Sequence, residues 1–435
     1  MHISAGDTAW MLTSTALVLF MMPGLALFYG GLVGAKNVVA TMVQSFVAIG
    51  LISLLWVIIG YSLTFGTDHG GVIGGLQNAM LAGVGAKPNI YAPTIPALLY
   101  MAFQMKFAVI TPALIAGAFC ERMRFRGYLV FIGLWSLIVY FPFAHAVWGA
   151  GGILGSGGLH AIDFAGGSVV HELAGSAALA TALFLRRRHQ LERPHNIPLV
   201  LLGAGILWFG WFGFNAGSAL SAGSVATSAL VNTQLGGSAA MLAWMTVEWW
   251  RRGKPTGAGI AAGAVAGLAA ITPASGYVPP WAAIIIGAAA GLLCYGAVHL
   301  KDIFHYDDSL DVVGVHMVGG LIGVVLTGVF ASLAVNAAGQ PGGLTQLGRQ
   351  LVLAVAGIGY PFVMTWIILW IIDKTVGLRV DPDDEQDGLD LAEHGEPAYD
   401  VVPPSVLAMA GVASNGESAA SGTEDGEAAA PEAVS

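Results

Sequence analysis

Two histidines lie in the middle of strongly apolar stretches, where ionisable side chains are rare. His171 is part of the segment SVVHELAG, and His316 is part of VGVHMVGG. An ionisable residue inside a membrane-spanning helix usually marks a route for an ion or a proton. A neutral imidazole has one donor and one acceptor, so two rings that share a proton can offer a polar edge inside an apolar tube. We therefore expect one pathway built from both halves of the chain.

Two other interpretations of these histidines stay open. Each ring could instead be a separate core histidine that bonds a backbone carbonyl. A metal site is a further alternative, but zinc requires three or four ligands, and no acid or cysteine recurs at ligand spacing. Cys120 and Cys294 lie in apolar segments and are expected to be small core residues. We expect neither a metal nor a cofactor.

The elements that position the histidines must be membrane-spanning helices. The chain has 435 residues, of which 56% are hydrophobic and 10% are charged, whereas a soluble domain has about 25% charged residues. A spanning helix needs about 20 apolar residues. With the stretches near 96–120 and 165–185, the uncharged runs predict an all-α polytopic protein with eleven spans. The runs without Asp, Glu, Lys or Arg are 8–35, 37–67, 127–162, 194–247, 255–300, 312–348 and 350–372.

Basic residues predict the orientation, because they collect in cytoplasmic loops. With the N-terminus outside, 14 of the 17 Lys and Arg residues fall in inner loops, two (Lys87 and Arg349) fall in outer loops, and Lys106 lies inside a helix. The inner ones are Lys36, Arg122, Arg124, Arg126, Arg186, Arg187, Arg188, Arg193, Arg251, Arg252, Lys254, Lys301, Lys374 and Arg379.

Two internal matches predict an inverted repeat. The string ITPA occurs at 110–113, in the third predicted helix, and again at 271–274, in the eighth. The histidine segments fall in the fifth and tenth helices. Both pairs are five helices apart, and an odd offset reverses the direction of crossing. Helices 1–5 are therefore expected to repeat as helices 6–10, with helix 11 outside the repeat. Small-residue strings such as 257–270 and 287–293 predict close helix packing.

Aromatic residues near the predicted outer ends could hold a cation. Phe103 and Phe107 lie on one face of helix 3, Trp148 follows helix 4, and Phe214 ends helix 6 beside Ser218. A cation over an aromatic face gains roughly 0.5–2 kcal/mol. The alternative for each of these aromatic residues is an interfacial belt position.

Two acids each precede a histidine helix. Asp163 begins DFAGGSVVH, and Asp311 stands before the tenth helix. Both are predicted to cap exposed backbone N–H groups, and direct cation binding is the alternative.

The C-terminal part divides into two regions. Residues 1–376 form the predicted membrane domain, and residues 377–402 are a polar cytoplasmic region whose Leu389, Leu391, Ala398 and Tyr399 could dock on the inner face. Residues 403–435 are predicted to be a disordered acidic tail, since 411–435 carries acids, no basic residue and few large apolar side chains.

Several long segments resemble the ammonium transporter (ammonium transporter/methylammonium permease/Rh) family, and its microbial ammonium transporter branch in particular. The match runs in order over about residues 8–400. Its motifs are MMPGLALFYGGLV (21–33), FQMKFAVITPALIAGAFCERM (103–123), DFAGGSVVHELAGSAALA (163–180), WFGWFGFNAGSAL (208–220), DDSLDVVGVHMVGGLIG (307–323) and GLRVDPDDEQDGLDLAEHGEPAY (377–399).

The resemblance implies a role for each site residue. Phe107, Trp148 and Ser218 would recruit ammonium at the outer side, with Gln104 and Trp211 near them. Phe107 and Phe214 would stack as a gate below this site. His171 and His316 would be the twin histidines of an apolar pore, and Asp163 would support the entrance.

The resemblance also implies partners. It implies a homotrimer in the cell membrane with one pore in each subunit, which carries ammonium or methylammonium. Residues 376–400 would communicate with a PII-type signal protein, which in the family plugs the inner pore when nitrogen is plentiful. No nucleic-acid partner is implied.

The expected mechanism begins with binding and dehydration of ammonium at the aromatic site. The ion then loses its proton, and ammonia passes the histidines, whereas potassium cannot shed its charge and is rejected. An ammonium sensor with little flux is the alternative. An intramembrane enzyme would need a nucleophile or a metal set, and the sequence offers neither.

Two charged residues depart from the family pattern beside the pore. Lys106 precedes Phe107 and Glu172 follows His171. Counted from the predicted helix starts at 1.5 Å per residue, they lie at similar depths. We hypothesise a buried ion pair between helices 3 and 5. The alternative is that each finds its own partner, with Lys106 bonding carbonyls and Glu172 protonated.

Overall fold

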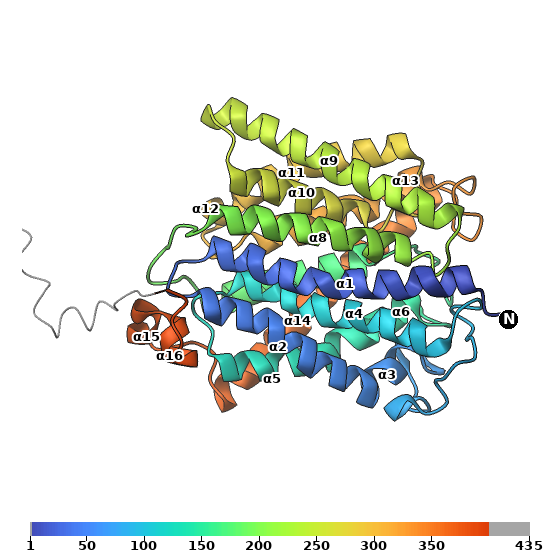
Figure 1. The fold of residues 1–435 in the computed structure, drawn as a ribbon, viewed down its shortest axis with the longest axis horizontal. Helices are drawn as coiled ribbons and strands as arrows, with labels where there is room; N and C mark the ends of the chain where they lie inside the picture. Colours follow the sequence, from blue (N-terminus) through green and yellow to red (C-terminus); the bar gives the residue numbers. More distant parts are fainter. Residues whose placement is uncertain (1, 400–435) are drawn as a thin grey trace, which may run out of the picture.

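The computed structural model describes residues 2–399 and shows a bundle of long helices (Figure 1). We call the end that carries the N-terminus and residues 66–96 the N face, and the end that carries residues 376–399 the C face. Helices that follow one another in sequence cross the bundle in alternating directions. Predictions that concern residues 403–435 lie outside the described part of the chain.

Eleven long helical segments are present in residues 2–399, as the sequence predicts. Several contain a short π-helical or 3-10 stretch, and these are named η here. The first half comprises α1 (Ala5–Leu32); α2 (Val38–Leu55), η1 (Trp56–Gly60) and α3 (Tyr61–Phe65); α4 (Ala97–Ile115) and η3 (Ala116–Ala118); α5 (Phe125–Trp135), η4 (Ser136–Tyr140) and α6 (Phe141–Trp148); and η5 (Gly167–Glu172) with α7 (Leu173–Leu185). The second half comprises α8 (Ile197–Gly217), α9 (Ser224–Arg252), α10 (Gly257–Ile271), α11 (Pro280–Val298) with α12 (Leu300–Phe304), η6 (Val313–Met317) with α13 (Val318–Phe330), and α14 (Leu344–Thr375).

Nine of these segments in the described residues are long and apolar enough to cross a membrane. The other two are α9, which is less apolar, and α10, which is shorter. The predicted pairs of helices within 194–247 and 255–300 are confirmed. The only strands in residues 2–399 are β1 (Asp68–His69) and β2 (Ile73–Gly74), which form a small antiparallel hairpin at the N face, near the turn η2 (Ala79–Leu81).

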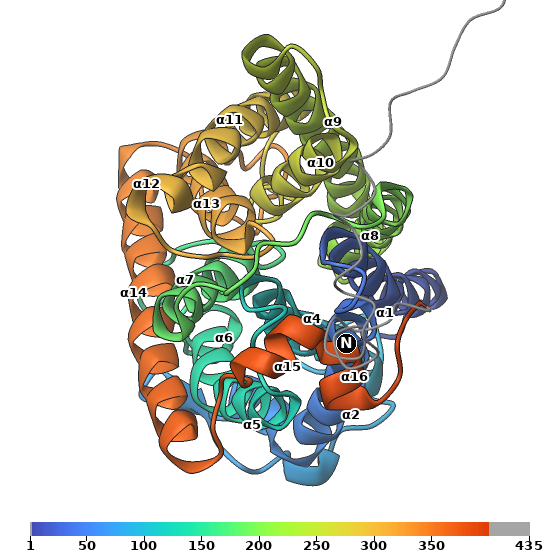
Figure 2. The same cartoon turned by 90° about the vertical axis from the view of Figure 1, so that its left-hand side faces the viewer.

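Small residues bring the helices close together. A side chain at Gly203 of α8 would lie 2.3 Å from the backbone nitrogen of Phe28 in α1, and one at Gly287 of α11 would lie 2.3 Å from the carbonyl oxygen of Gly236 in α9. The predicted small-residue face at 287–293 is thus a packing surface. Figure 2 shows the bundle end-on, with α14 crossing its side next to α7 and α13.

The C-terminal region docks on the C face through two short helices, α15 (Pro382–Asp387) and α16 (Leu389–His394). Asp390 accepts a hydrogen bond from the backbone N–H of Ala40 at 2.8 Å, and Leu389 is buried against the start of α2. Glu385 pairs with Arg379 at 2.9 Å. Of the residues named as possible docking contacts, Leu389 is buried, Ala398 packs on the core and Leu391 is exposed. Tyr399 is partly exposed, but its hydroxyl lies 3.0 Å from the His195 Nε2 atom.

Charged residues form a buried network at the C face. Arg188 binds the carboxylate of Asp307 through two nitrogens, at 2.9 and 2.8 Å, and also contacts Glu121. Arg122 lies 3.7 Å from the same aspartate. Burial opposes ionisation of Asp307, but the Arg188 hydrogen bonds and the two guanidinium charges lower its pKa to about 2. At neighbouring Asp308, burial and then repulsion by Asp311 raise the pKa to about 7.

These opposite shifts predict opposite effects of substitution. The pKa of Asp307 is depressed below the unfolded value of 3.8, so its stabilisation is present above that value and persists at pH 5.5 and 8.5. Asp307→Asn should lower the midpoint of thermal unfolding in detergent by roughly 5–10 °C at both pH values, because it removes the buried carboxylate that faces Arg122 and Arg188 and leaves Glu121 as the remaining acid on Arg188.

The matched variant is Asp308→Asn. The pKa of Asp308 is raised, so its contribution to stability falls as the pH rises from the unfolded value of 3.8 to about 7, and the loss is complete above that pH. This variant should raise the unfolding midpoint at pH 5.5 and raise it further at pH 8.5, because the asparagine side chain does not ionise. Equal destabilisation by both variants at both pH values would contradict the assignment of these charges.

Candidate functional site

The two histidines meet at the centre of the bundle. The Nδ1 atoms of His171 and His316 are 3.2 Å apart, and their rings are nearly parallel, with an interplanar angle of 13°. Since a hydrogen bond needs one donor and one acceptor, one ring carries its proton on Nδ1 and the other on Nε2. The pair therefore offers one Nε2–H donor and one bare Nε2 acceptor. The Nε2 atom of His171 has no partner in the described residues.

Each histidine lies in a π-helical stretch at the start of a spanning helix. His171 lies in η5, which begins at the N face, and His316 lies in η6, which begins at the C face. The helices run in opposite directions, in agreement with the predicted inverted repeat. π-Helical turns are rare and are frequent at functional sites. A side chain at Gly175 of α7 would lie 2.3 Å from the backbone nitrogen of Met317, so the two helices are in direct contact.

Asp163 caps the first of these helices, as the sequence predicts. Its carboxylate accepts hydrogen bonds from four backbone N–H groups at 2.7 to 3.1 Å, those of Gly166, Gly167, Ser168 and Val169. All four donors would otherwise lack intrahelical partners.

The prediction that Asp311 caps the second helix is wrong. Asp308 does so instead, and it accepts from the backbone N–H of Val313 at 2.7 Å. The side chain of Asp311 pairs with Lys301. The adjacent acids in DDSLD made this choice ambiguous, because backbone geometry decides which carboxylate reaches the helix end.

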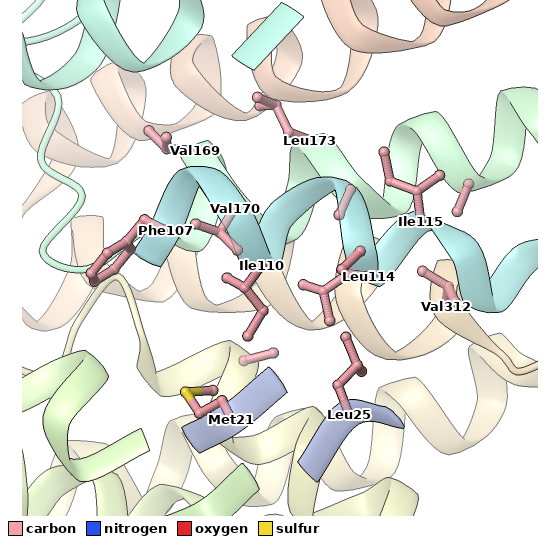
Figure 3. Close-up of a cluster of buried hydrophobic side chains, with 14 of the residues drawn as sticks. Met21, Leu25, Phe107, Ile110, Leu114, Ile115, Val169, Val170, Leu173 and Val312 are labelled. Atoms are coloured by element: carbon pink, nitrogen blue, oxygen red, sulfur yellow. The ribbon is translucent and has the colours of Figure 1, made fainter. Parts of the chain in front are cut away.

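A narrow apolar cavity surrounds the histidines. Figure 3 shows Ile110 and Leu114 of α4 pointing toward Met21 and Leu25 of α1, with Val170 beside them. These residues line the cavity together with both histidines. Its volume is about 10 Å³, close to the room that one water molecule needs. An apolar passage of this width leaves no room for a hydrated ion.

A wider cavity of about 440 Å³ opens at the N face. It brings together five predicted site residues, which are Gln104, Phe107, Trp148, Asp163 and Ser218. The Phe107 and Trp148 rings are perpendicular, with centroids 6.0 Å apart. The indole nitrogen of Trp148 donates to the carbonyl of Asp163 at 2.9 Å, and the Ser218 hydroxyl donates to the carbonyl of Phe214 at 2.8 Å. The serine oxygen therefore keeps its lone pairs free to accept.

Phe107 and Phe214 separate this cavity from the narrow one. Their ring centroids are 4.2 Å apart, and both side chains are buried. Phe103 packs against Phe107 with centroids 5.0 Å apart and is a buried support rather than part of the cavity lining. The aromatic pair closes the passage in this conformation.

Trp211 lies on the other side of the pair from its expected position. Its ring stacks on His171 with centroids 5.4 Å apart, and its nitrogen donates to Thr272 at 2.9 Å. It lines the narrow cavity and not the N-face cavity. Trp211 precedes Phe214 by about one helical turn, and the direction in which α8 crosses places it deeper in the bundle.

A third cavity, of about 270 Å³, opens at the C face. His316 borders both this cavity and the narrow one, whereas His171 borders only the latter. Its lining includes Tyr29, Glu248, Lys301 and Asp311. Sequence reasoning considered Asp311 as a helix cap and counted Lys301 among the inner basic residues, but it did not single out Tyr29 or Glu248. The three cavities follow one another from one face to the other.

Two wide cavities that contain polar residues, joined by a narrow apolar passage with a central hydrogen-bonding pair, are the architecture of a membrane transport protein. The chain belongs to the Ammonium Transporter Family, whose sequence pattern matches residues 9–399.

Relatives and solved structures agree with this family. The chain is 47% identical to a Bacillus subtilis ammonium transporter over 401 residues, which cover 91% of this chain and 98% of the relative. It is similar to the crystal structure of Mep2 from Candida albicans, with a TM-score of 0.83, 38% identity and 91% of each chain covered. A solved protein described as a sensor Amt protein is also similar, with a TM-score of 0.82, 28% identity, and 89% of this chain and 98% of that chain covered.

The predicted ion pair between Lys106 and Glu172 is not formed. Within residues 2–399, no acid lies within 4.0 Å of the Lys106 ammonium, and its nearest polar contact is the Met105 sulfur at 4.0 Å. The Glu172 carboxyl is buried and turned toward α14, where a side chain at Gly357 would lie 2.4 Å from it. Its oxygens have no hydrogen-bond partner in the described residues. Similar depth along two helices did not determine which faces the side chains occupy.

This arrangement predicts independent effects of the two residues. Glu172→Gln keeps the shape of an uncharged carboxyl, and Lys106→Met keeps an unbranched chain. Each should change the free energy of unfolding by less than about 1 kcal/mol. The double variant should show the sum of the two changes, with a coupling below about 0.5 kcal/mol. Recovery of stability in the double variant, measured by thermal unfolding in detergent, would instead restore the ion-pair hypothesis.

Proposed function

We propose that this protein conducts ammonium nitrogen across a cell membrane, taking up the ion at the N-face cavity and passing it as ammonia through the narrow passage. The observation that carries the proposal is the His171–His316 pair, which is the hydrogen-bonding feature of an otherwise apolar passage between two wide cavities. The family membership supports ammonium as the substrate.

Recruitment uses the faces of two rings and one hydroxyl. Phe107 and Trp148 present perpendicular aromatic surfaces to the N-face cavity, and a cation over such faces gains roughly 0.5–2 kcal/mol per contact. The Ser218 oxygen accepts one ammonium N–H, and Gln104 lies in the same lining. Asp163 acts indirectly: its carboxylate is occupied by the helix end, while its carbonyl fixes the Trp148 ring.

Passage requires loss of the proton. An unpaired charge in an apolar cavity is costly, so ammonium crosses as neutral ammonia after the Phe107 and Phe214 rings part. Ammonia then accepts from one histidine Nε2–H and donates to the other Nε2. Potassium has no proton to lose and is excluded. The Nδ1–Nδ1 hydrogen bond also joins the two rings in a route along which a proton can pass.

Further features of the family belong to the same proposal. The chain forms a homotrimer in the cell membrane, with the N face outside and the C face in the cytoplasm. The 14-to-2 distribution of basic residues supports this orientation.

The apolar side chains exposed along α1 and α11, such as Phe20 and Leu292, suit contact with lipid or another subunit. Methylammonium is an accepted analogue.

A second candidate is an ammonium sensor with little flux. The similarity to the sensor Amt protein favours it, although the identity of 28% is below the 47% shared with the Bacillus transporter. Uptake of radiolabelled methylammonium into proteoliposomes separates the two. We expect uptake by the wild-type protein and at least a tenfold loss in His171→Ala, because the apolar passage then lacks its hydrogen-bonding pair. Folded wild-type protein without flux would favour the sensor, and full flux in the variant would refute the pore assignment.

The recruitment site predicts an effect on affinity. Trp148→Leu removes one aromatic face and keeps an apolar residue, so the apparent affinity for methylammonium should fall by a factor of about 5–30. The maximal rate should change less, since the histidines are untouched. Concentration-dependent uptake measures both parameters. An unchanged half-saturating concentration would remove Trp148 from the site.

The C-terminal region is proposed to bind a PII-type signal protein at the C face. Truncation after Val376 removes the Arg379–Glu385 pair and the α15–α16 unit and should abolish co-purification with such a protein. Truncation after Pro404 keeps this unit and is the matched control, which should retain binding. Loss of binding in the control would assign the partner to the tail instead.

A further inference from the structure

A buried histidine at the N face is not used in the proposed mechanism. His145 lies on α6, one turn before Trp148, and its side chain is fully buried. Its Nδ1 lies 2.8 Å from the carbonyl oxygen of Thr64, and its Nε2 lies 2.9 Å from a carboxylate oxygen of Asp68. Both ring nitrogens are thus at hydrogen-bonding distance from oxygen atoms.

Neither oxygen atom can donate a proton in return. A backbone carbonyl is only an acceptor, and so is an ionised carboxylate. The hydrogen bond from His145 and then that from the Gly71 backbone N–H lower the pKa of Asp68, whose side chain is partly exposed, so this acid is ionised. A neutral ring would point a lone pair at one of these oxygens. Satisfying both contacts requires protons on both nitrogens.

The end of a long helix favours the same charge. Thr64 is next to the last residue of the continuous segment formed by α2, η1 and α3, which spans Val38–Phe65. The carbonyl oxygens at a helix C-terminus carry partial negative charge and stabilise a cation there. His145 therefore bonds the helix end with Nδ1 and the carboxylate with Nε2. Nearby titratable groups are His69 on the hairpin, Tyr61 on α3 and Tyr91 before α4, and none of them carries a carboxylate.

The contacts of His145 connect the hairpin to the end of α6. Asp68 belongs to β1, and Gly71 in the same hairpin accepts a hydrogen bond from the backbone N–H of Ile153 at 2.8 Å. A side chain at Gly151 would lie 2.9 Å from Asp68. The hairpin thus rests on the segment that directly follows Trp148. His145 holds this assembly to α3, and the Trp148 ring projects from it into the N-face cavity.

We infer that His145 is a positioning residue, held as an imidazolium between Asp68 and Thr64, that fixes the end of α6 and so sets the place of Trp148 in the recruitment site. The expected effect on transport rests on the proposed function. The charge on the His145 ring does not depend on that function. The positive charge is paired with Asp68 and does not oppose ammonium in the cavity.

The protonation state can be measured without transport. In the detergent-solubilised protein labelled with ¹⁵N-histidine at pH 7, one imidazole should show both nitrogens protonated. Asp68→Asn identifies it, because the amide can donate to a bare Nε2 and the ring can then be neutral. His69→Gln is the control on the same strand and should leave this signal in place. A wild-type spectrum without an imidazolium that responds to Asp68→Asn would overturn the inference.

Transport tests the positioning role. Asp68→Ala should raise the half-saturating concentration of methylammonium by roughly 3–10-fold, comparable to the net contribution of one ordinary hydrogen bond because the effect on the site is indirect, and leave the maximal rate within about twofold. Asp68→Asn should retain most of the affinity, since it keeps a hydrogen bond, and His69→Gln should behave as the wild type. An unchanged half-saturating concentration in Asp68→Ala, or equal loss of the maximal rate in both Asp68 variants, would overturn the positioning role. If the His145 ring is charged but the wild-type protein shows no flux, the proposed function is refuted and the inference about the ring charge stands.

Discussion

The hydrogen bond between His171 and His316 sets the main constraint on this structure. It joins two helices that enter from opposite faces, and it must form in an apolar cavity with room for little more than one water molecule. A polar group buried without a partner would cost several kcal/mol there, so each Nδ1 is satisfied by the other ring. This arrangement leaves the Nε2 atoms available to a small polar molecule.

Several features of the fold serve this contact. The carboxylate of Asp163 holds the four leading N–H groups of the first histidine helix, and Asp308 holds the start of the second. Gly175 lets α7 touch η6. The polar atoms that start each helix are therefore satisfied at the two faces, and the middle of the bundle stays apolar. The same caps keep the histidine rings at a fixed depth.

Most charged residues of the described chain lie at the two ends of the bundle, and Lys106 of α4 lies between them. At the C face, Arg188, Arg122 and Asp307 form a buried network that ties three loops together. At the N face, the buried His145 is paired with Asp68 beside the N-face cavity. Glu172 is a further ionisable residue away from the ends; its buried carboxyl has no hydrogen-bond partner in the described residues, and a neutral carboxyl avoids the cost of a lone charge at that depth.

Hydrophobicity alone determined much of this protein. Uncharged runs predicted the eleven helices, because lipid requires about 20 apolar residues for each crossing, and the two isolated histidines were correctly expected to meet. Asp163 was identified as a cap because an acid at a helix start has a local role. The tertiary structure alone decided what depends on side-chain direction. It placed Trp211 beside His171, gave the second cap to Asp308 rather than Asp311, turned Glu172 away from Lys106, and brought Asp68 to His145 across 77 residues of sequence. Composition and spacing determine how deep a residue lies along a helix, but the packing of neighbouring helices determines which way it faces.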